Sequence, residues 1–204
     1  MVRHGVTDWN IEFRAQGHAD VALNERGRRQ AEEVARKLSE FPIAAVYSSD
    51  LSRAFDTAAA IAASHGIEVK VEPGFREIDQ GEWTGLTDDE IRRRWPDRWG
   101  PARYSTPRPG GESPDEVRRR ALEALERVVS AHPDATVAIV SHGVTIRTLM
   151  GEALGIARHT LSTLRGLGNG GVACLEARRD GAALVLGRLE RLDGRTPRAD
   201  DPNQ

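Results

Sequence analysis

Val2-Arg3-His4-Gly5 opens the chain, and Val140-Ser141-His142-Gly143 repeats its pattern near the other end. In both stretches a His-Gly pair follows an apolar run and precedes polar sequence. The carboxyl ends of neighbouring parallel strands lie side by side, and ligands bind just outside them. These two stretches therefore predict two parallel strands that bring the imidazoles of His4 and His142 into one crevice.

The composition is that of a globular protein with a charged surface. The 204 residues fit one domain, and the net charge of −2 provides no global basic field for nucleic acid or a membrane. The only cysteine, Cys174, excludes a disulfide framework and a cysteine-based metal site within this chain. A reducing compartment, the cytoplasm, is the default expectation for such a chain. No apolar run reaches the roughly 18 to 20 residues that span a bilayer.

Strands and helices alternate along the chain. Short apolar runs predict strands at about 43–47, 67–71 and 136–140, and helical periodicity predicts helices at about 25–40, 51–64, 114–132 and 144–154. Strands at about 171–177 and 183–190 form a predicted antiparallel edge hairpin around Asp180-Gly181. This order predicts a three-layer α/β/α sandwich with a mostly parallel central sheet.

Two regions depart from the regular pattern. Only Met1 and Val2 precede Arg3, whereas a central strand usually has about five residues, so we expect the rest of this strand to lie upstream. Residues 73–112 hold five prolines, a short helix at about 88–95 and three of the four tryptophans, and we interpret them as an inserted roof segment over the site. We expect residues 1–192 to form a single domain and residues 193–204 to be a disordered tail.

Some residues in this pattern are expected to be structural. Trp83, Trp95 and Trp99 are predicted to form the small core of the roof segment. The run Arg118-Arg119-Arg120 is predicted to lie on a solvated helix face.

Basic groups gather where the predicted strands end. Arg3 and His4 follow the first strand, Arg53 lies in the first turn of the helix after the second, and His142 follows the strand at 136–140. Arginine binds phosphate oxygens in a bidentate manner, so this set suits a phosphate dianion. An imidazole whose other nitrogen is bonded to a backbone carbonyl could attack phosphorus, with protonated His142 as a charged neighbour.

A phosphate ester also needs a proton donor for its leaving oxygen. The segment 76–83 contains three carboxyl groups that could supply it, Glu77, Asp79 and Glu82. Reasoning from the residues alone leaves the choice among the three open.

Taken together, these segments resemble the histidine phosphatase superfamily, in its phosphoglycerate-mutase-like branch. The resemblance spans about residues 2–145 and is carried, in the order of the family, by Arg3 to Asn10, Arg14-Ala15-Gln16-Gly17, Ser48 to Ala54, Glu77 to Gly85, Gly110-Gly111-Glu112-Ser113 and Ser141-His142-Gly143. Each motif alone is weak, but their combination in this order is highly specific.

The resemblance implies a role for each matching position. His4 would be the phosphorylated nucleophile, and Glu77 the proton donor that later draws a proton from water. The positions expected to bind the phosphoryl group are Arg3, Arg53 and His142, and those expected to touch phosphate or substrate are Asn10, Gln16, Gly17 and Gly143. Neither a metal ion nor an organic cofactor is implied.

One departure bears on the reaction. Cofactor-dependent mutases carry a Glu-Arg-His-Tyr-Gly type segment where this chain has Gly81-Glu82-Trp83-Thr84-Gly85, a form that resembles the phosphatase members. We therefore expect a metal-independent phosphomonoesterase that acts on a small phosphorylated metabolite, for example a phosphoglycerate or a sugar phosphate. A phosphoglycerate mutase and a catalytically idle phospholigand-binding protein remain the alternatives. A homodimer is an open option, and neither nucleic acid nor a membrane is an expected partner.

Overall fold

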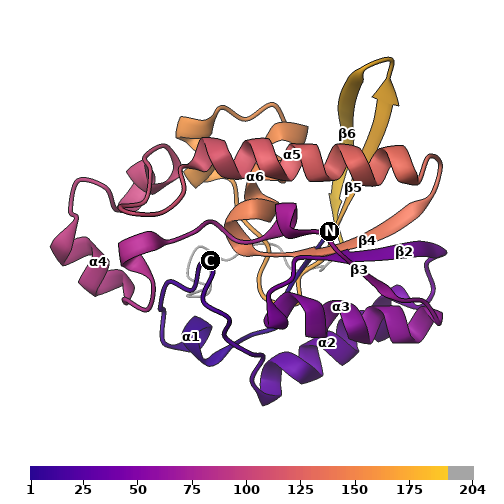
Figure 1. The fold of residues 1–204 in the computed structure, drawn as a ribbon, viewed down its shortest axis with the longest axis horizontal. Coiled ribbons are helices and arrows are strands. Elements are labelled where there is room, and N and C mark those ends of the chain that lie inside the picture. The colour runs from indigo at the N-terminus through magenta and orange to yellow at the C-terminus, as the bar shows by residue number, and fades with distance from the viewer. Residues whose placement is uncertain (193–204) are drawn as a thin grey trace.

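A four-stranded parallel sheet forms the centre of the molecule in the computed structural model, which describes residues 1–192 apart from the side chains of Pro101, Ala102, Arg158 and Arg191 (Figure 1). The strand order is β1-β4-β2-β3, with β1 at Val2–Arg3, β4 at Thr136–Ser141, β2 at Ile43–Ser48 and β3 at Val69–Val71. Helices α2 (Glu25–Leu38) and α3 (Ser52–His65) lie on one face, and α5 (Pro114–Ala131) and α6 (Gly143–Ala153) lie on the other. The predicted three-layer arrangement is confirmed, while the predicted tail, 193–204, lies outside the described residues.

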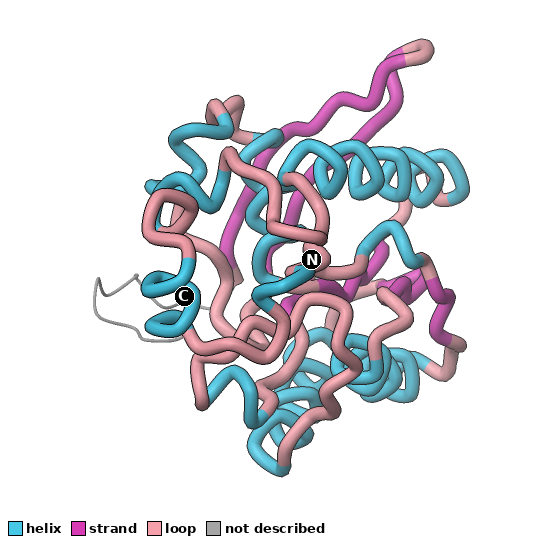
Figure 2. Tube along the Cα trace, turned by 60° about the vertical axis from the view of Figure 1, so that its left-hand side comes forward, coloured by secondary structure: helices cyan, strands magenta, loops and turns pink. Residues whose placement is uncertain are grey.

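The antiparallel hairpin forms a small sheet of its own. Strands β5 (Ala173–Asp180) and β6 (Ala183–Arg191) pair with each other around Gly181. Their ends project beyond α5, as Figures 1 and 2 show. Among the described residues, an antiparallel bridge from Val2 to Val172, with backbone hydrogen bonds between Met1 and Ala173 and from Arg3 to Gly171, joins this pair to the parallel sheet. The connection is this small because β1 is only two residues long.

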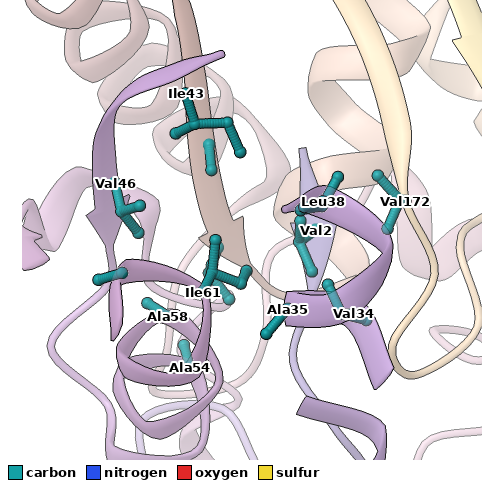
Figure 3. Close-up of a cluster of buried hydrophobic side chains, with 13 residues drawn as sticks. Val2, Val34, Ala35, Leu38, Ile43, Val46, Ala54, Ala58, Ile61 and Val172 are labelled. Carbon is teal, nitrogen blue, oxygen red and sulfur yellow. The ribbon is translucent and has the colours of Figure 1, made fainter. Parts of the chain in front are cut away.

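The first core lies between the sheet and helices α2 and α3 (Figure 3). Val2, Val46 and Val140 contribute from three adjacent strands, and each is almost fully buried. The facing side of α3 is built from small residues such as Ala54 and Ala58, which let the helix approach the sheet closely. A second core, which includes Leu125, Val128, Ile139 and Leu149, packs α5 and α6 on the opposite face. Parallel strands covered on both faces in this way need the continuous apolar runs seen in the sequence.

The roof segment is made of short helices. Helix α4 (Asp88–Arg94) begins at a capping box formed by Thr87 and Glu90. The roof segment also contains the 3-10 turns η1 (Pro73–Phe75), η2 (Gly81–Trp83) and η3 (Gly100–Tyr104). Outside the roof segment, the described residues include two further short helices, α1 (Asp8–Ile11) and the 3-10 turn η4 (Arg158–Thr163). The ring of Trp83 is buried and contacts those of Trp95 and Trp99, so the predicted aromatic core of the roof is confirmed. Within the described residues, no helix is both long enough and apolar enough to cross a membrane.

Helix α2 touches the backbone of the loop that follows β1. A Cβ atom on Gly27 would lie 2.1 Å from the carbonyl oxygen of Val6, and one on Gly5 would lie 2.4 Å from the carbonyl oxygen of Gly27. Both distances are far below van der Waals contact, and both neighbours are backbone atoms that cannot rotate away. Glycine at these two positions therefore allows the His4 loop to pack directly on α2.

We predict that Gly27→Ala destabilises the protein although it places a better helix former in α2. The gain in helix propensity is at most about 1 kcal/mol, whereas overpacking costs about 1–3 kcal/mol and here meets rigid backbone. Gly168→Ala is the matched control, because a Cβ atom there meets nothing within 4 Å. Urea denaturation should show a loss for Gly27→Ala alone, and equal stability of both variants would contradict the close-packing argument.

Candidate active site

The register of β1 on β4 places the two histidines next to each other. Arg3 lies opposite Ser141, so the following residues, His4 and His142, leave the sheet side by side. The backbone N–H of His4 donates to the carbonyl of Ser141 at 3.1 Å, and the two imidazole centroids are 5.1 Å apart. The predicted crevice with two imidazoles is therefore present at the carboxyl ends of the strands.

His4 is held in one tautomer. Its Nδ1 donates to the carbonyl oxygen of Gly5 at 2.6 Å, and because that oxygen can only accept, Nδ1 carries the hydrogen. Nε2 is then the nitrogen with a lone pair. Burial, with the positive charges of Arg53 and Arg3, holds the pKa of His4 well below its ordinary value. His4 is consequently a neutral imidazole at pH 7, with its basic nitrogen available for attack.

His142 is fully buried beside it. Its Nε2 and the hydroxyl of Ser49 share a hydrogen bond of 2.6 Å, while its Nδ1 has no partner among the described residues. Burial is the main cause that lowers the pKa of His142 well below its ordinary value, and Arg53 and His4 add to it. Protonation of His142, expected beside a phosphoryl group, is therefore disfavoured in the protein alone, because the loss of water and the positive charges of Arg53, Arg120 and Arg3 oppose a further charge. A phosphoryl dianion beside it would raise this pKa.

Arg53 is a buried cation positioned by two backbone carbonyls. Its Nη1 donates to Ala19 and its Nη2 to Gly17, both at 2.8 Å, and only 1% of the residue is exposed. Its Nε is buried without a hydrogen-bond partner among the described residues. Burial lowers the pKa of Arg53 to about 10, so the guanidinium keeps its charge at pH 7. Arg3 lines the same pocket and donates through Nη1 to the carbonyl of Leu167 at 2.7 Å.

Glu77 lies at the amino-terminal end of α6. Its carboxylate accepts hydrogen bonds from the backbone N–H groups of Val144 at 3.1 Å and Thr145 at 3.3 Å. A helix amino terminus is a favourable place for a carboxylate, because its first N–H groups have no partner within the helix. Of the three candidate acids, Glu77 lines the pocket that contains His4, whereas Asp79 and Glu82 do not.

Arg120 holds the loop that carries Glu77. The prediction that this arginine lies on a solvated helix face is therefore wrong. Its guanidinium donates to the carbonyl oxygens of Gly74, Arg76 and Glu77 and to the carboxylate of Glu112, at 2.7 to 2.9 Å. The sequence contained a signal that could have revealed this. Arg120 is three residues after Val117 and four before Ala124, both buried, so it lies on the inner face of α5.

The four predicted substrate-contact positions all line this pocket: Asn10, Gln16, Gly17 and Gly143. Asn10 also stabilises the start of α1, because its Oδ1 accepts a hydrogen bond from the backbone N–H of Thr7 in the capping box of that helix. The Oε1 of Gln16 is buried and has no hydrogen-bond partner among the described residues. Buried polar atoms without partners are costly, and Gln16 and Arg53, which carry two of them, line the pocket together with His4.

The pocket has a volume of about 190 Å³ and a strong excess of positive charge. Among the described residues, six arginines but only two carboxylates, Glu77 and Asp88, line it, although the net charge of the chain is −2. Four of these arginines were not predicted as site residues: Arg14, which was quoted only as part of a motif, and Arg103, Arg108 and Arg147. The position of Arg147 could have been predicted from its spacing. Residues four apart on a helix share a face, and Arg147 comes four residues after Gly143. For the two roof arginines no periodic pattern was available.

No group of three His, Cys, Asp or Glu side chains in the described part of the chain is arranged to hold a metal ion. The site is built from imidazole, guanidinium, one carboxylate and backbone N–H groups. Such a set, in an α/β fold, has the charge and hydrogen-bond donors that suit a phosphoryl group beside a histidine.

Comparison with known proteins identifies the family to which the chain belongs. The model of the histidine phosphatase superfamily (branch 1) matches residues 1–189, and the chain belongs to this superfamily as a phosphomonoesterase of the histidine phosphatase type. It is 42% identical over 166 residues to phosphoglycerate mutase-like protein 4 of Arabidopsis thaliana, covering 78% of this chain and 71% of that protein. It is 37% identical over 159 residues to phosphoserine phosphatase 1 of Hydrogenobacter thermophilus, covering 76% and 75%.

A solved structure shares the whole architecture. The mycobacterial glucosyl-3-phosphoglycerate phosphatase in complex with VO3 superposes with a TM-score of 0.84 at 32% identity, covering 93% of this chain and 95% of that one. The fold class predicted from the sequence is thereby confirmed by an independent structure.

The buried neutral His142 makes stability depend on pH. In the unfolded chain this group binds a proton near pH 6.5, whereas in the folded protein its pKa is well below that value. The unfolded state therefore binds more protons below pH 6.5, so stability should fall as the pH falls through that region. We predict that His142→Gln reduces the slope of unfolding free energy against pH between 6.5 and 5. Urea titrations of both proteins at several pH values measure this slope, and identical slopes would show that folding does not lower the pKa of His142.

Proposed function

We propose that the protein hydrolyses phosphomonoesters of a small metabolite through a phosphohistidine on His4. The observation that carries this proposal is the hydrogen bond from Nδ1 of His4 to the carbonyl of Gly5, which leaves a neutral, basic Nε2 in a cationic pocket. A nucleophile with its lone pair directed by a fixed tautomer needs no separate base to activate it.

In the first step, the Nε2 lone pair of His4 forms the N–P bond while the P–O bond to the alcohol breaks. Glu77, which lines the same pocket, enters this step as the neutral acid and gives its proton to the leaving oxygen. The negative charge on the transferred group is stabilised by Arg3 and Arg53, and the unpartnered Nε of Arg53 and Nδ1 of His142 are suited to contact its oxygens. His142 takes up a proton from solvent when the dianion binds, because the negative charge beside it raises its pKa.

In the second step, water attacks phosphorus and the N–P bond breaks. Glu77, now a carboxylate, accepts a proton from this water, and the electron pair of the N–P bond returns to Nε2 of His4. Phosphate leaves and the neutral imidazole is restored. The anchoring of Glu77 to the first N–H groups of α6 keeps the carboxylate in place through both steps.

Hydrolysis rather than mutase transfer is favoured by the roof segment. Trp83, in the Gly81 to Gly85 segment that resembles phosphatase members, is buried in the roof core and contacts Trp95 and Trp99. Relatives that are named phosphatases of phosphoserine and of glucosyl-3-phosphoglycerate support the same assignment. A mutase would depend strongly on a bisphosphorylated primer, and we expect phosphate release here without one.

We predict that His4→Ala abolishes the release of phosphate from p-nitrophenyl phosphate in the presence of EDTA, because no other group can form the N–P bond. The wild type should turn over under the same conditions. His159→Ala, a change at an exposed histidine outside the pocket, is the control and should retain full activity. Turnover by His4→Ala at the wild-type rate would exclude the phosphohistidine route.

We predict that Glu77→Gln has an effect that depends on the leaving group. Loss of a general acid costs about 10²–10⁴-fold for an alkyl phosphate, while p-nitrophenolate leaves with little need of a proton and should lose far less. Glu82→Gln removes an exposed carboxylate of the same segment and serves as the control. Equal losses for good and poor leaving groups would mean that Glu77 is not the proton donor.

A further inference from the structure

A side chain from the segment between η4 and β5 contacts the backbone of the nucleophile. Nδ2 of Asn169 donates to the carbonyl oxygens of His4 at 3.1 Å and Gly5 at 3.4 Å. The backbone N–H of the next residue, Gly170, donates to the carbonyl oxygens of Arg3 at 3.0 Å and His4 at 3.2 Å. This segment is therefore bound to the corner at which β1 ends, although Asn169 is 165 residues away from His4 in the sequence.

The peptide group between Gly5 and Val6 is held at both of its polar ends. Its carbonyl oxygen has two lone pairs and accepts from Nδ1 of His4 at 2.6 Å and from Nδ2 of Asn169. Its N–H, on Val6, donates to Oε1 of Gln30 at 2.8 Å. Because this carbonyl selects the tautomer of His4, contacts that keep the peptide from turning also keep Nε2 of His4 as the nitrogen with the lone pair.

Asn169 also sets the orientation of the Asn10 side chain. Oδ1 of Asn10 accepts from the backbone N–H of Thr7 at 3.1 Å, from the Thr7 hydroxyl at 3.1 Å and from Nδ2 of Asn169 at 3.2 Å. A backbone N–H can only donate, and the carbonyls of His4 and Gly5 can only accept, so these partners fix which end of each amide carries the oxygen. The Nδ2 of Asn10 is thereby left as the donor that this side chain offers in the pocket it lines.

Within the described part of the chain, the side-chain hydrogen bonds of Asn169 all come from one end of its amide. Its Oδ1 is buried and has no partner there. An unpaired buried acceptor lowers stability, so the side chain is poorly suited to a purely structural role. Its donor group, in contrast, meets three oxygens, which belong to His4, to Gly5 and to Asn10.

We propose that Asn169 is a positioning residue for phosphoryl transfer. It turns the Nδ2 of Asn10 toward an oxygen of the phosphoryl group, and it holds the Gly5 carbonyl that fixes the tautomer of His4. Asn169 does not line the pocket itself, so it acts through Asn10 and His4. A donor that is oriented before the anion arrives needs no reorganisation when the anion binds. This inference rests on the proposed function, because it gives Asn169 a role in that reaction.

A double-mutant cycle tests whether Asn169 acts through Asn10. The probe is inorganic phosphate, whose affinity is measured by calorimetry in EDTA, and kcat/KM for p-nitrophenyl phosphate is the second readout. We expect Asn169→Ala to weaken phosphate binding by about tenfold, the size expected when a hydrogen bond to a charged group is lost, and to lower kcat/KM at least as much. In an Asn10→Ala background the same change should weaken phosphate binding by less than about twofold, because the oriented donor is already absent.

This coupling distinguishes positioning from a contribution to the fold alone. A residue that only stabilised the fold would cause the same loss in both backgrounds, because its effect would not pass through Asn10.

Two further variants complete the design. Gly168→Ala is the matched control, because it adds a methyl group next to Asn169 where a Cβ atom meets nothing within 4 Å. It should leave both readouts within about twofold of the wild type. Asn169→Leu has nearly the size of asparagine but no hydrogen-bonding group. It takes the place of Asn169→Ala if thermal melting shows that the alanine variant does not fold.

The outcomes separate the role of Asn169 from the proposed function. Equal losses of phosphate affinity in the two backgrounds, or an unchanged affinity in Asn169→Ala, overturn the role of Asn169 and leave the phosphatase mechanism standing. A wild type that binds phosphate but releases none from p-nitrophenyl phosphate in EDTA overturns the proposed function, while the cycle still decides whether Asn169 orients Asn10. A wild type that does not bind phosphate overturns both.

Discussion

Pairing of β1 with β4 is the constraint on which the site depends. Only two residues of β1 enter the sheet, yet their register puts Arg3 opposite Ser141 and so makes His4 and His142 neighbours. A shift by one residue would send alternate side chains to the other face and separate the two imidazoles. The contacts of Gly5 and Gly27 also hold the His4 loop against α2, because backbone packs on backbone at positions where any side chain would collide.

The same physical situation recurs throughout the pocket: buried cations are positioned by neutral oxygens. Backbone carbonyls of Gly17 and Ala19 hold Arg53, and the backbone carbonyl of Leu167 accepts a hydrogen bond from Arg3. A tyrosine hydroxyl joins Arg103 and Arg147. Neutral acceptors fix a guanidinium without cancelling its charge, so the positive potential remains available to an anion. This arrangement explains how a chain of net charge −2 can have a strongly cationic pocket.

How well each feature could be predicted from the sequence depends on whether the interactions that set it are local or join distant segments. Periodicity and capping are local, so helices α2 to α6 were predicted to within a few residues, including α5 with its Ser113-Glu116 capping box, whereas the four-residue α1 was not predicted. The charge state of His142 in the protein alone depends on burial and on Arg53, which is remote in sequence, so local patterning could not predict that its pKa is lowered there. Arg120 was assigned to solvent because a run of three arginines suggests a polar face, although its spacing from Val117 placed it inside.

The sequence by itself determined the α/β order, the two His-Gly corners and the set of residues from which a phosphoryl site is built, because these follow from local patterning and motif order. The tertiary structure decided which of Glu77, Asp79 and Glu82 reaches the pocket, since only Glu77 meets the first N–H groups of α6. It also brought the roof arginines onto the same pocket as Arg147. Those contacts join segments about forty residues apart, and such pairings are set by packing rather than by any local signal.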